Sequence, residues 1–171
     1  ITYGDWSSDV CSSDLLKKVI DAVKHNSAAQ EVSAHCDGPC GVYDPASARI
    51  AAEAVLSMTK KILALEVPSC DDAATLAAYE NTVSRFIAIK EQQAHLAKEE
   101  LLVLWTDYFK PEHLDAFPEL HDTFWKAAKL CSACKVEVNQ AKAEELMAAI
   151  ENIHGKFWAS KNRDVAWYTA S

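Results

Sequence analysis

Residues 73–108 read AATLAAYENTVSRFIAIKEQQAHLAKEELLVLWTDY, and the expected architecture follows from this segment. Apolar or small side chains recur along it mostly three or four residues apart, which places them on one face of a helix. These residues are Val83, Ile87, Ala94, Ala97, Leu101, Leu104 and Tyr108. The stretch therefore predicts a long amphipathic helix from about Ala73 to about Tyr108. Phe109-Lys110-Pro111 ends it, because proline disfavours helical backbone at the residue before it.

Three further amphipathic helices are expected around this one. One begins at Asp44-Pro45, since Asp caps free N–H groups and Pro suits a first turn, and it ends near Pro68. Another opens at Pro118, and the last follows Asn139. Their expected buried faces are, in chain order, Ala51, Val55, Met58, Ile62 and Leu65; Leu120, Phe124, Ala127, Cys131 and Cys134; and Leu146, Ile150, Ile153 and Phe157. The sequence thus predicts an all-α fold, an antiparallel up-and-down four-helix bundle over about residues 45–160, followed by a C-terminal tail.

The composition limits the class of protein. The chain has 171 residues, half of them hydrophobic, and only four glycines, which is typical of a helical domain with a core of its own. The net charge is −8 and no basic run exceeds a Lys-Lys pair, so nucleic acid and anionic membrane surfaces are poor partners. No apolar run approaches the length of a membrane span. The six cysteines do not form the framework of a secreted disulfide protein, and we expect a cytoplasmic location.

The residues that precede the bundle divide into two parts. Asp5–Leu15 reads DWSSDVCSSDL, which resembles the translation of a common DNA sequencing adapter. Residues 1–15 are therefore interpreted as an assembly artefact or a disordered tail and left out of the fold. Residues 16–34 begin with apolar side chains at helical spacing, become polar, and end in small residues. We expect a leader that is cut after Ala34, with an ordinary first helix and linker as the alternative.

A hook without helical or strand periodicity lies between this leader and the first bundle helix. Residues 35–43 read HCDGPCGVY, and the Gly and Pro residues favour a compact, turned segment. His35, Cys36 and Cys40 bring an imidazole and two thiols within six residues. Thiolates are soft ligands, so one small loop can deliver them to a single metal ion.

Three kinds of site compete for this hook. A structural zinc site needs a fourth ligand, which Cys131 or Cys134 could supply, although both continue a core face and are better explained as buried free cysteines. A redox dithiol normally has C-x-x-C spacing on a thioredoxin-like fold, which neither the hook nor the helices fit. The third possibility is a transition metal in a flat nitrogen–sulfur site.

The segment His35–Pro45, HCDGPCGVYDP, resembles the N-terminal hook of nickel-containing superoxide dismutases, whose motif is H-C-x-x-P-C-G-x-Y. The resemblance continues through KEQ at residues 90–92, LWTDYFKP at 104–111 and PELH at 118–121, and it covers nearly all of the chain after Ala34. The cysteines of the third helix and the tail WYT at 167–169 are similar to cyanobacterial or marine members. The chain thus resembles a precursor form of such an enzyme.

This resemblance implies an oxidoreductase that converts superoxide to oxygen and hydrogen peroxide through a Ni(II)/Ni(III) couple, with one nickel ion per subunit. His35, Cys36 and Cys40 would be the metal ligands once a processing peptidase has cut after Ala34 and freed the His35 amine. Asp37 and Tyr43 would order the hook and position superoxide or water. The family assembles as a homohexamer. A non-enzymatic nickel- or zinc-binding bundle and an inactive dismutase relative remain as alternatives.

Some residues depart from the family or have structural explanations. Ala51 and Gln93 stand where the best-known members have a Glu and an Arg that orient the axial imidazole. Tyr108 is expected in the core or an interface, where it could border the site, and Lys110 could attract an anion locally. Outside the hook, four histidines are expected at the surface, at helix ends or in structural roles rather than as ligands: His95, His113, His121 and His154.

Overall fold

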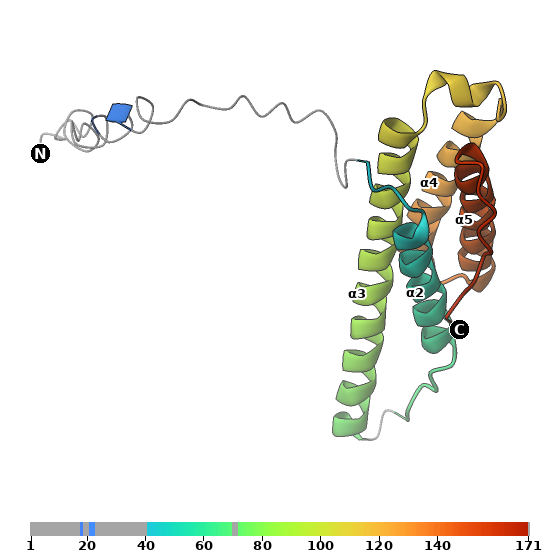
Figure 1. The fold of residues 1–171 in the computed structure, drawn as a ribbon. Coiled ribbons are helices and arrows are strands. Elements are labelled where there is room, and N and C mark those ends of the chain that lie inside the picture. Colours follow the sequence, from blue (N-terminus) through green and yellow to red (C-terminus); the bar gives the residue numbers. More distant parts are fainter. Residues whose placement is uncertain (1–17, 19–20, 23–40, 70–71, 171) are drawn as a thin grey trace, which may run out of the picture. The chain divides into compact units, whose positions relative to one another are not determined.

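Figure 1 shows the computed structural model of the chain, which describes residues 18, 21–22, 41–69 and 72–170. The chain divides into two compact units, Ile1–His35 and Cys36–Ser171. In the first unit, Lys18, Asp21 and Ala22 are described and are helical. The expected artefact at 1–15 lies outside the described residues, as does the rest of the expected leader at 16–34.

The described residues of the second unit form four α-helices: α2 (Ala46–Leu63), α3 (Ala73–Val103), α4 (Leu120–Val136) and α5 (Gln140–Ser160). The π-helical turn η1 (Leu104–Tyr108) continues α3, and the 3-10 turn η2 (Pro111–Leu114) follows it. Both α2 and α4 pack against α3 and α5, so each helix neighbours the next along the chain (Figure 1). No strand occurs among the described residues. The predicted up-and-down four-helix bundle is confirmed.

Three of the four described helices, α2, α3 and α5, begin at a side chain that accepts a hydrogen bond from a backbone N–H of the first turn. Asp44 Oδ1 accepts a hydrogen bond from the Ala46 N–H at 2.8 Å, and Asn139 Oδ1 accepts one from the Lys142 N–H at 3.2 Å. Asp72 caps α3 in the same way through the Ala74 N–H at 3.0 Å. These carboxylate and amide oxygens satisfy backbone donors that have no partner within the helix. The predicted starts at Asp44-Pro45 and after Asn139 are therefore confirmed.

The core fills the part of the bundle where all four helices overlap. There the predicted faces are buried, including Ala51, Val55, Ala94, Ala97, Leu101, Leu120, Phe124, Leu146, Ile150, Ile153 and Phe157. Val83, Ile87, Met58 and Ile62 are only half-buried, because the N-terminal part of α3 extends past α4 and α5 (Figure 1). The prediction that α2 reaches Leu65 is wrong, since the helix ends at Leu63.

The end of α3 differs from the straight helix that the sequence predicts. Residues 104–108 form a π turn, in which the Phe109 N–H donates to the Leu104 carbonyl at 3.1 Å. A π turn widens the helix by one residue and rotates the side chains that follow it.

None of the described helices combines the length and the apolar character that a membrane span requires.

Lys90 is the largest fully buried side chain of the unit, 1% exposed. Its Nζ donates to the carbonyls of Cys134, Lys135 and Glu137, the latter two at 3.1 and 3.0 Å. These carbonyls lie at the C-terminal end of α4, where backbone acceptors lack intrahelical partners. Burial lowers the pKa of the Lys90 amine, and the charge of Glu91 opposes this shift. The three acceptors match the three N–H donors of an ammonium group, so Lys90 ties α3 to the end of α4.

Lys90→Met should destabilise the bundle, because it leaves buried carbonyl oxygens at the end of α4 without donors. We expect a loss of about 2–4 kcal/mol in the free energy of unfolding, measured by urea denaturation. The exposed Lys60→Met is the matched control and should change stability by less than about 0.5 kcal/mol. Equal stability of the two variants would contradict the capping role of Lys90.

Candidate metal centre

The structure describes one of the five predicted site residues. His35, Cys36, Asp37 and Cys40 lie outside the described residues, and Tyr43 lies within them. Among the described residues, no three or more His, Cys, Asp or Glu side chains are grouped to hold a metal ion. The described part of the candidate centre is therefore the surface to which the hook is joined.

Gly41 and Tyr43 lead the chain from the hook into α2. Gly41 has a φ of +87°, a left-handed conformation that glycine adopts without a steric penalty. Tyr43 is half-buried and packs against the core cluster. Its ring centroid lies 5.7 Å from that of Tyr108, with the two planes inclined at 56°. The last residue of the hook thus packs on the π turn at the end of α3.

Tyr108 is held from several sides. Its ring lies 4.5 Å from Phe157 of α5 and meets Phe109 edge-on at 4.9 Å. Its hydroxyl lies 2.6 Å from Ser160 Oγ, and Ser160 Oγ donates to the Phe157 carbonyl at 2.7 Å. Because the Ser160 proton is engaged there, Tyr108 is the donor in the shared hydrogen bond. Tyr108 thereby joins the ends of α3 and α5 beneath Tyr43.

A hollow of about 380 Å³ borders Tyr43. The residues that line it are Val42, Tyr43, Asp44, Ala46, Ser47, Glu100, Val103 and Leu104. Within it, the Ser47 hydroxyl donates to Glu100 Oε2 at 2.7 Å and so links the first turn of α2 to α3. This hollow includes the last residues of the hook, Val42 and Tyr43, and the first residues after it.

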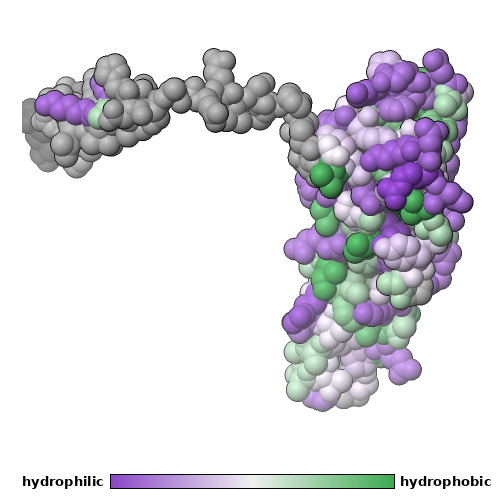
Figure 2. All heavy atoms as spheres, viewed as in Figure 1, coloured by the Kyte–Doolittle hydropathy of each residue, from purple (hydrophilic) through white to green (hydrophobic). Residues whose placement is uncertain are grey.

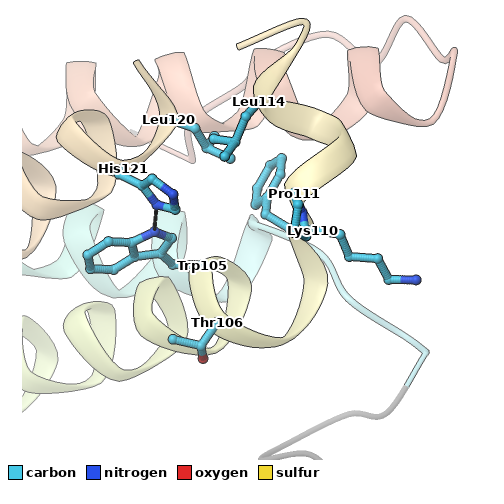
Figure 3. Close-up of a pocket in the computed structure, with 8 residues that line it drawn as sticks. Trp105, Thr106, Lys110, Pro111, Leu114, Leu120 and His121 are labelled. Carbon is cyan, nitrogen blue, oxygen red and sulfur yellow. Dashed lines mark hydrogen bonds between the residues drawn. The ribbon is translucent and has the colours of Figure 1, made fainter. Parts of the chain in front are cut away.

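A second hollow of similar size is lined by residues of η1, η2 and the start of α4 (Figure 3). It is mostly apolar, with Trp105, Phe109, Leu114 and Leu120 among its lining residues. Trp105 Nε1 donates to His121 Nδ1 at 2.8 Å, so the structural role expected for His121 is confirmed. The side chain of Lys110 extends away from the hollow in Figure 3.

The other histidines are placed as follows. His95 is exposed and lies 3.2 Å from Glu99, and His113 Nδ1 accepts the Lys110 N–H at 2.9 Å in η2. The expectation of a surface or helix-end position is wrong for His154, which is 8% exposed inside α5. Its Nε2 lies 2.8 Å from the Val165 carbonyl. The tail that covers His154 has no periodic pattern, so the sequence did not predict this burial.

Ala51 and Gln93, which differ from the best-known members of the family that the sequence resembles, lie on α2 and α3. Ala51 is fully buried in the core, and Gln93 is half-buried on α3. Instead, α2 carries a buried ion pair in which Arg49 donates to Glu53 Oε2 at 3.1 Å. This pair was not predicted from the sequence, although its i,i+4 spacing is the signal that would have identified it.

Cys131 and Cys134 are buried free cysteines of α4, as predicted. Burial, together with the charge of Cys134, raises the pKa of the Cys131 thiol to about 12, and burial also raises that of Cys134. Metals bind thiolates rather than thiols. These two side chains therefore behave as small apolar groups of the core rather than as ligands.

The comparisons with known proteins agree with one another. The family model described as nickel-containing superoxide dismutase matches residues 30–161. The Superoxide dismutase [Ni] of Streptomyces seoulensis is 44% identical over 131 residues, which are 77% of this chain and 91% of that protein. The corresponding protein of Streptomyces coelicolor is 42% identical over 130 residues, 76% and 90% of the two chains.

Solved structures show the same likeness. A crystal structure of a Ni-containing superoxide dismutase after partial X-ray-induced reduction is similar with a TM-score of 0.63 and 43% identity, covering 75% of this chain and 99% of that one. The native structure of a nickel superoxide dismutase at 1.30 Å gives a TM-score of 0.62 and 41% identity, with 74% and 99% covered.

The burial of Cys131 and Cys134 predicts that their thiols resist alkylation. In the folded, metal-free protein, iodoacetamide at neutral pH should label Cys36 and Cys40 within minutes while both α4 cysteines stay unmodified. Mass spectrometry of tryptic peptides would show this, and these four of the six thiols in the chain should all react in denaturant. Labelling of Cys131 at the denatured rate would contradict its assignment to the core.

Proposed function

The chain belongs to the nickel-containing superoxide dismutase family, and from this premise we propose that its nickel ion is held by the hook at residues 35–43. The match of the family model to residues 30–161 carries the conclusion, because it spans the bundle and the ligand-bearing motif together. The enzyme converts two superoxide anions and two protons to oxygen and hydrogen peroxide, with one nickel ion per subunit. When bound, nickel supplies the one-electron couple for both halves of the reaction.

The proposed nickel ligands are His35, Cys36 and Cys40. Anionic thiolates and nitrogen donors stabilise a higher oxidation state, and a planar arrangement of such donors suits Ni(II). The two thiols that the structure describes, Cys131 and Cys134, are buried and protonated, which favours the hook as the source of thiolates. The donor set of the hook therefore fits nickel chemically.

Tyr43 and Asp37 are proposed to order the hook and to position superoxide or water. Tyr43 has support for this role, because its ring is seated on Tyr108, which Phe157 and Ser160 fix in turn. A phenol held in this way can donate a proton or a hydrogen bond with little further loss of conformational entropy, because its orientation is already fixed. The proposed role of Asp37 is supported by the family motif alone.

We propose that residues 16–34 are removed after Ala34 by a processing peptidase. The reason is chemical: while Ala34 is joined to His35, the His35 nitrogen is a peptide amide and lacks the lone pair of an amine ligand. Residues 1–15 would then play no part in the active enzyme. The working form would begin at His35.

A homohexamer is the proposed assembly. Apolar side chains are set among polar ones on the face of α2 and α3 in Figure 2. Exposed large hydrophobic side chains on these two helices are Ile50, Leu63, Ile89, Leu96 and Leu102. Exposed large hydrophobic side chains on two neighbouring helices are the observation that supports burial of this face between subunits.

Two finer proposals rest on the sequence alone. The cysteine-bearing α4 and the tail at 167–169 suggest a cyanobacterial or marine branch of the family. The number and spacing of the cysteines suit a reducing, cytoplasmic compartment.

Processing should switch the activity on. Protein that begins at His35 and is loaded with nickel should dismutate superoxide in a xanthine oxidase assay, whereas protein that retains residues 16–34 should not. The control is the trimmed protein with Cys40→Ser, which keeps the free amine and loses one thiolate. Nickel-loaded trimmed protein without activity would overturn the enzymatic function.

Removing the Tyr43 hydroxyl tests the role of this residue. Tyr43→Phe keeps the ring on Tyr108, so the melting temperature and nickel content should stay unchanged while kcat/KM falls roughly two- to tenfold, the effect of one hydrogen bond. The half-buried Tyr79→Phe on α3 is the control and should leave kcat/KM unaltered. Equal activity of both variants would show that the Tyr43 hydroxyl takes no part in the reaction.

A further inference from the structure

Residues 162–170 form a tail that begins where the match to the family model ends, at residue 161. In Figure 1 the tail turns back from the end of α5, runs alongside that helix and finishes next to α2. A tail of this length with no helix or strand needs specific contacts to be held against a domain. The structure shows such contacts on both helices.

The first contacts fix the tail to α5. Asn162 has a φ of +54°, which turns the chain, and the Arg163 N–H donates to the Trp158 carbonyl at 3.0 Å. The Arg163 guanidinium lies 4.7 Å over the Trp158 ring. Further along, the ring of Trp167 meets His154 edge-on at 5.3 Å. His154 also lies within hydrogen-bond distance of the Val165 backbone.

The last contacts fix the tail to α2. Tyr168 places its ring 4.4 Å below the guanidinium carbon of Arg49. Two residues later, the Ala170 N–H donates to Glu53 Oε1 at 2.7 Å, while Glu53 Oε2 accepts from Arg49. Arg49 and Glu53 are only 5% and 9% exposed. The tail thus ends on a buried ion pair.

This ion pair differs from the other i,i+4 pairs of the protein. His95–Glu99 and Asp122–Lys126 are more than half exposed, where such contacts contribute little. A buried pair instead costs desolvation energy, which is offset only when its remaining polar atoms find partners. The tail provides these partners, an N–H for the second Glu53 oxygen and an aromatic face for Arg49. The pair therefore anchors the tail to α2.

The position of the anchor gives it a further role. Arg49 and Glu53 lie in the first two turns of α2, and α2 begins three residues after Tyr43. We propose that residues 162–170 are a strap that fastens the hook end of α2 to α5 and so helps to hold the nickel hook in position. The hook-holding role rests on the proposed function, whereas the fastening of α2 to α5 does not. Arg49 and Glu53 are positioning residues in this proposal.

The test uses protein that begins at His35 and carries Glu53→Ala, with Glu53→Gln as the conservative variant and the exposed Glu99→Ala as the matched control. Hydrogen exchange of the peptide 162–171, followed by mass spectrometry without nickel, measures whether the strap is seated. We expect exchange to be roughly 5- to 30-fold faster in Glu53→Ala. Glu53→Gln should lie between Glu53→Ala and the unchanged protein, and Glu99→Ala should match the latter.

The second measurement is the rate at which nickel passes to a chelator in the loaded proteins. We expect faster nickel loss in Glu53→Ala and in protein that stops after Lys161, with no change in Glu99→Ala. If the shortened protein fails to fold, Tyr168→Ala replaces it, because it removes only the ring over Arg49. Unchanged nickel loss despite a freed tail would overturn the proposal, as would equal exchange of the tail in all variants.

The two measurements separate the strap from the function on which it rests. A tail that is protected in the unchanged protein but freed in Glu53→Ala supports the fastening of α2 whether or not nickel binds. Failure of the unchanged protein to bind nickel or to dismutate superoxide would instead overturn the proposed function, and the hook-holding role with it.

Discussion

The contact between Tyr43 and Tyr108 is the interaction on which the candidate site depends. Tyr43 is the last residue of the hook, and its ring lies on that of Tyr108, 5.7 Å away. The π turn that carries Tyr108 places it against Phe157 and Ser160, so one aromatic side chain joins the ends of α3 and α5. Whatever fixes Tyr108 therefore also fixes the point at which the hook leaves the bundle.

Much of the fold could be predicted because helix periodicity and capping are local properties. Asp44-Pro45 and Asn139 marked helix starts correctly, and the buried faces of α4 and α5 were assigned residue by residue. Burial along α3 was overestimated at Val83 and Ile87, since a periodic face does not tell how far the partner helices extend. The π turn was not predicted, because the periodic apolar face continues through Leu104 and Tyr108 as in an ordinary helix.

The candidate site was predictable to a different degree. The ligand set came from a short motif whose residues lie outside the described part of the chain, so it stays a prediction. The burial of Arg49 and Glu53 could not be foreseen, because it requires a partner 117 residues away in sequence, the Ala170 N–H. For the same reason His154 was expected at the surface: its cover is a tail without periodicity, and only tertiary contacts place it there.

The two cysteine pairs show why spacing alone does not define thiol chemistry. Cys36/Cys40 and Cys131/Cys134 are similarly close in sequence, yet the surrounding residues differ in kind. The α4 pair lies three residues apart on an apolar helical face, where burial raises the pKa of both thiols and keeps them neutral. The hook pair is set among Gly, Pro and Asp, in a segment without an apolar face that could bury it. Since a metal needs deprotonated sulfur, the protonated thiols of α4 are poor ligands, and the proposal that the hook holds nickel does not compete with them.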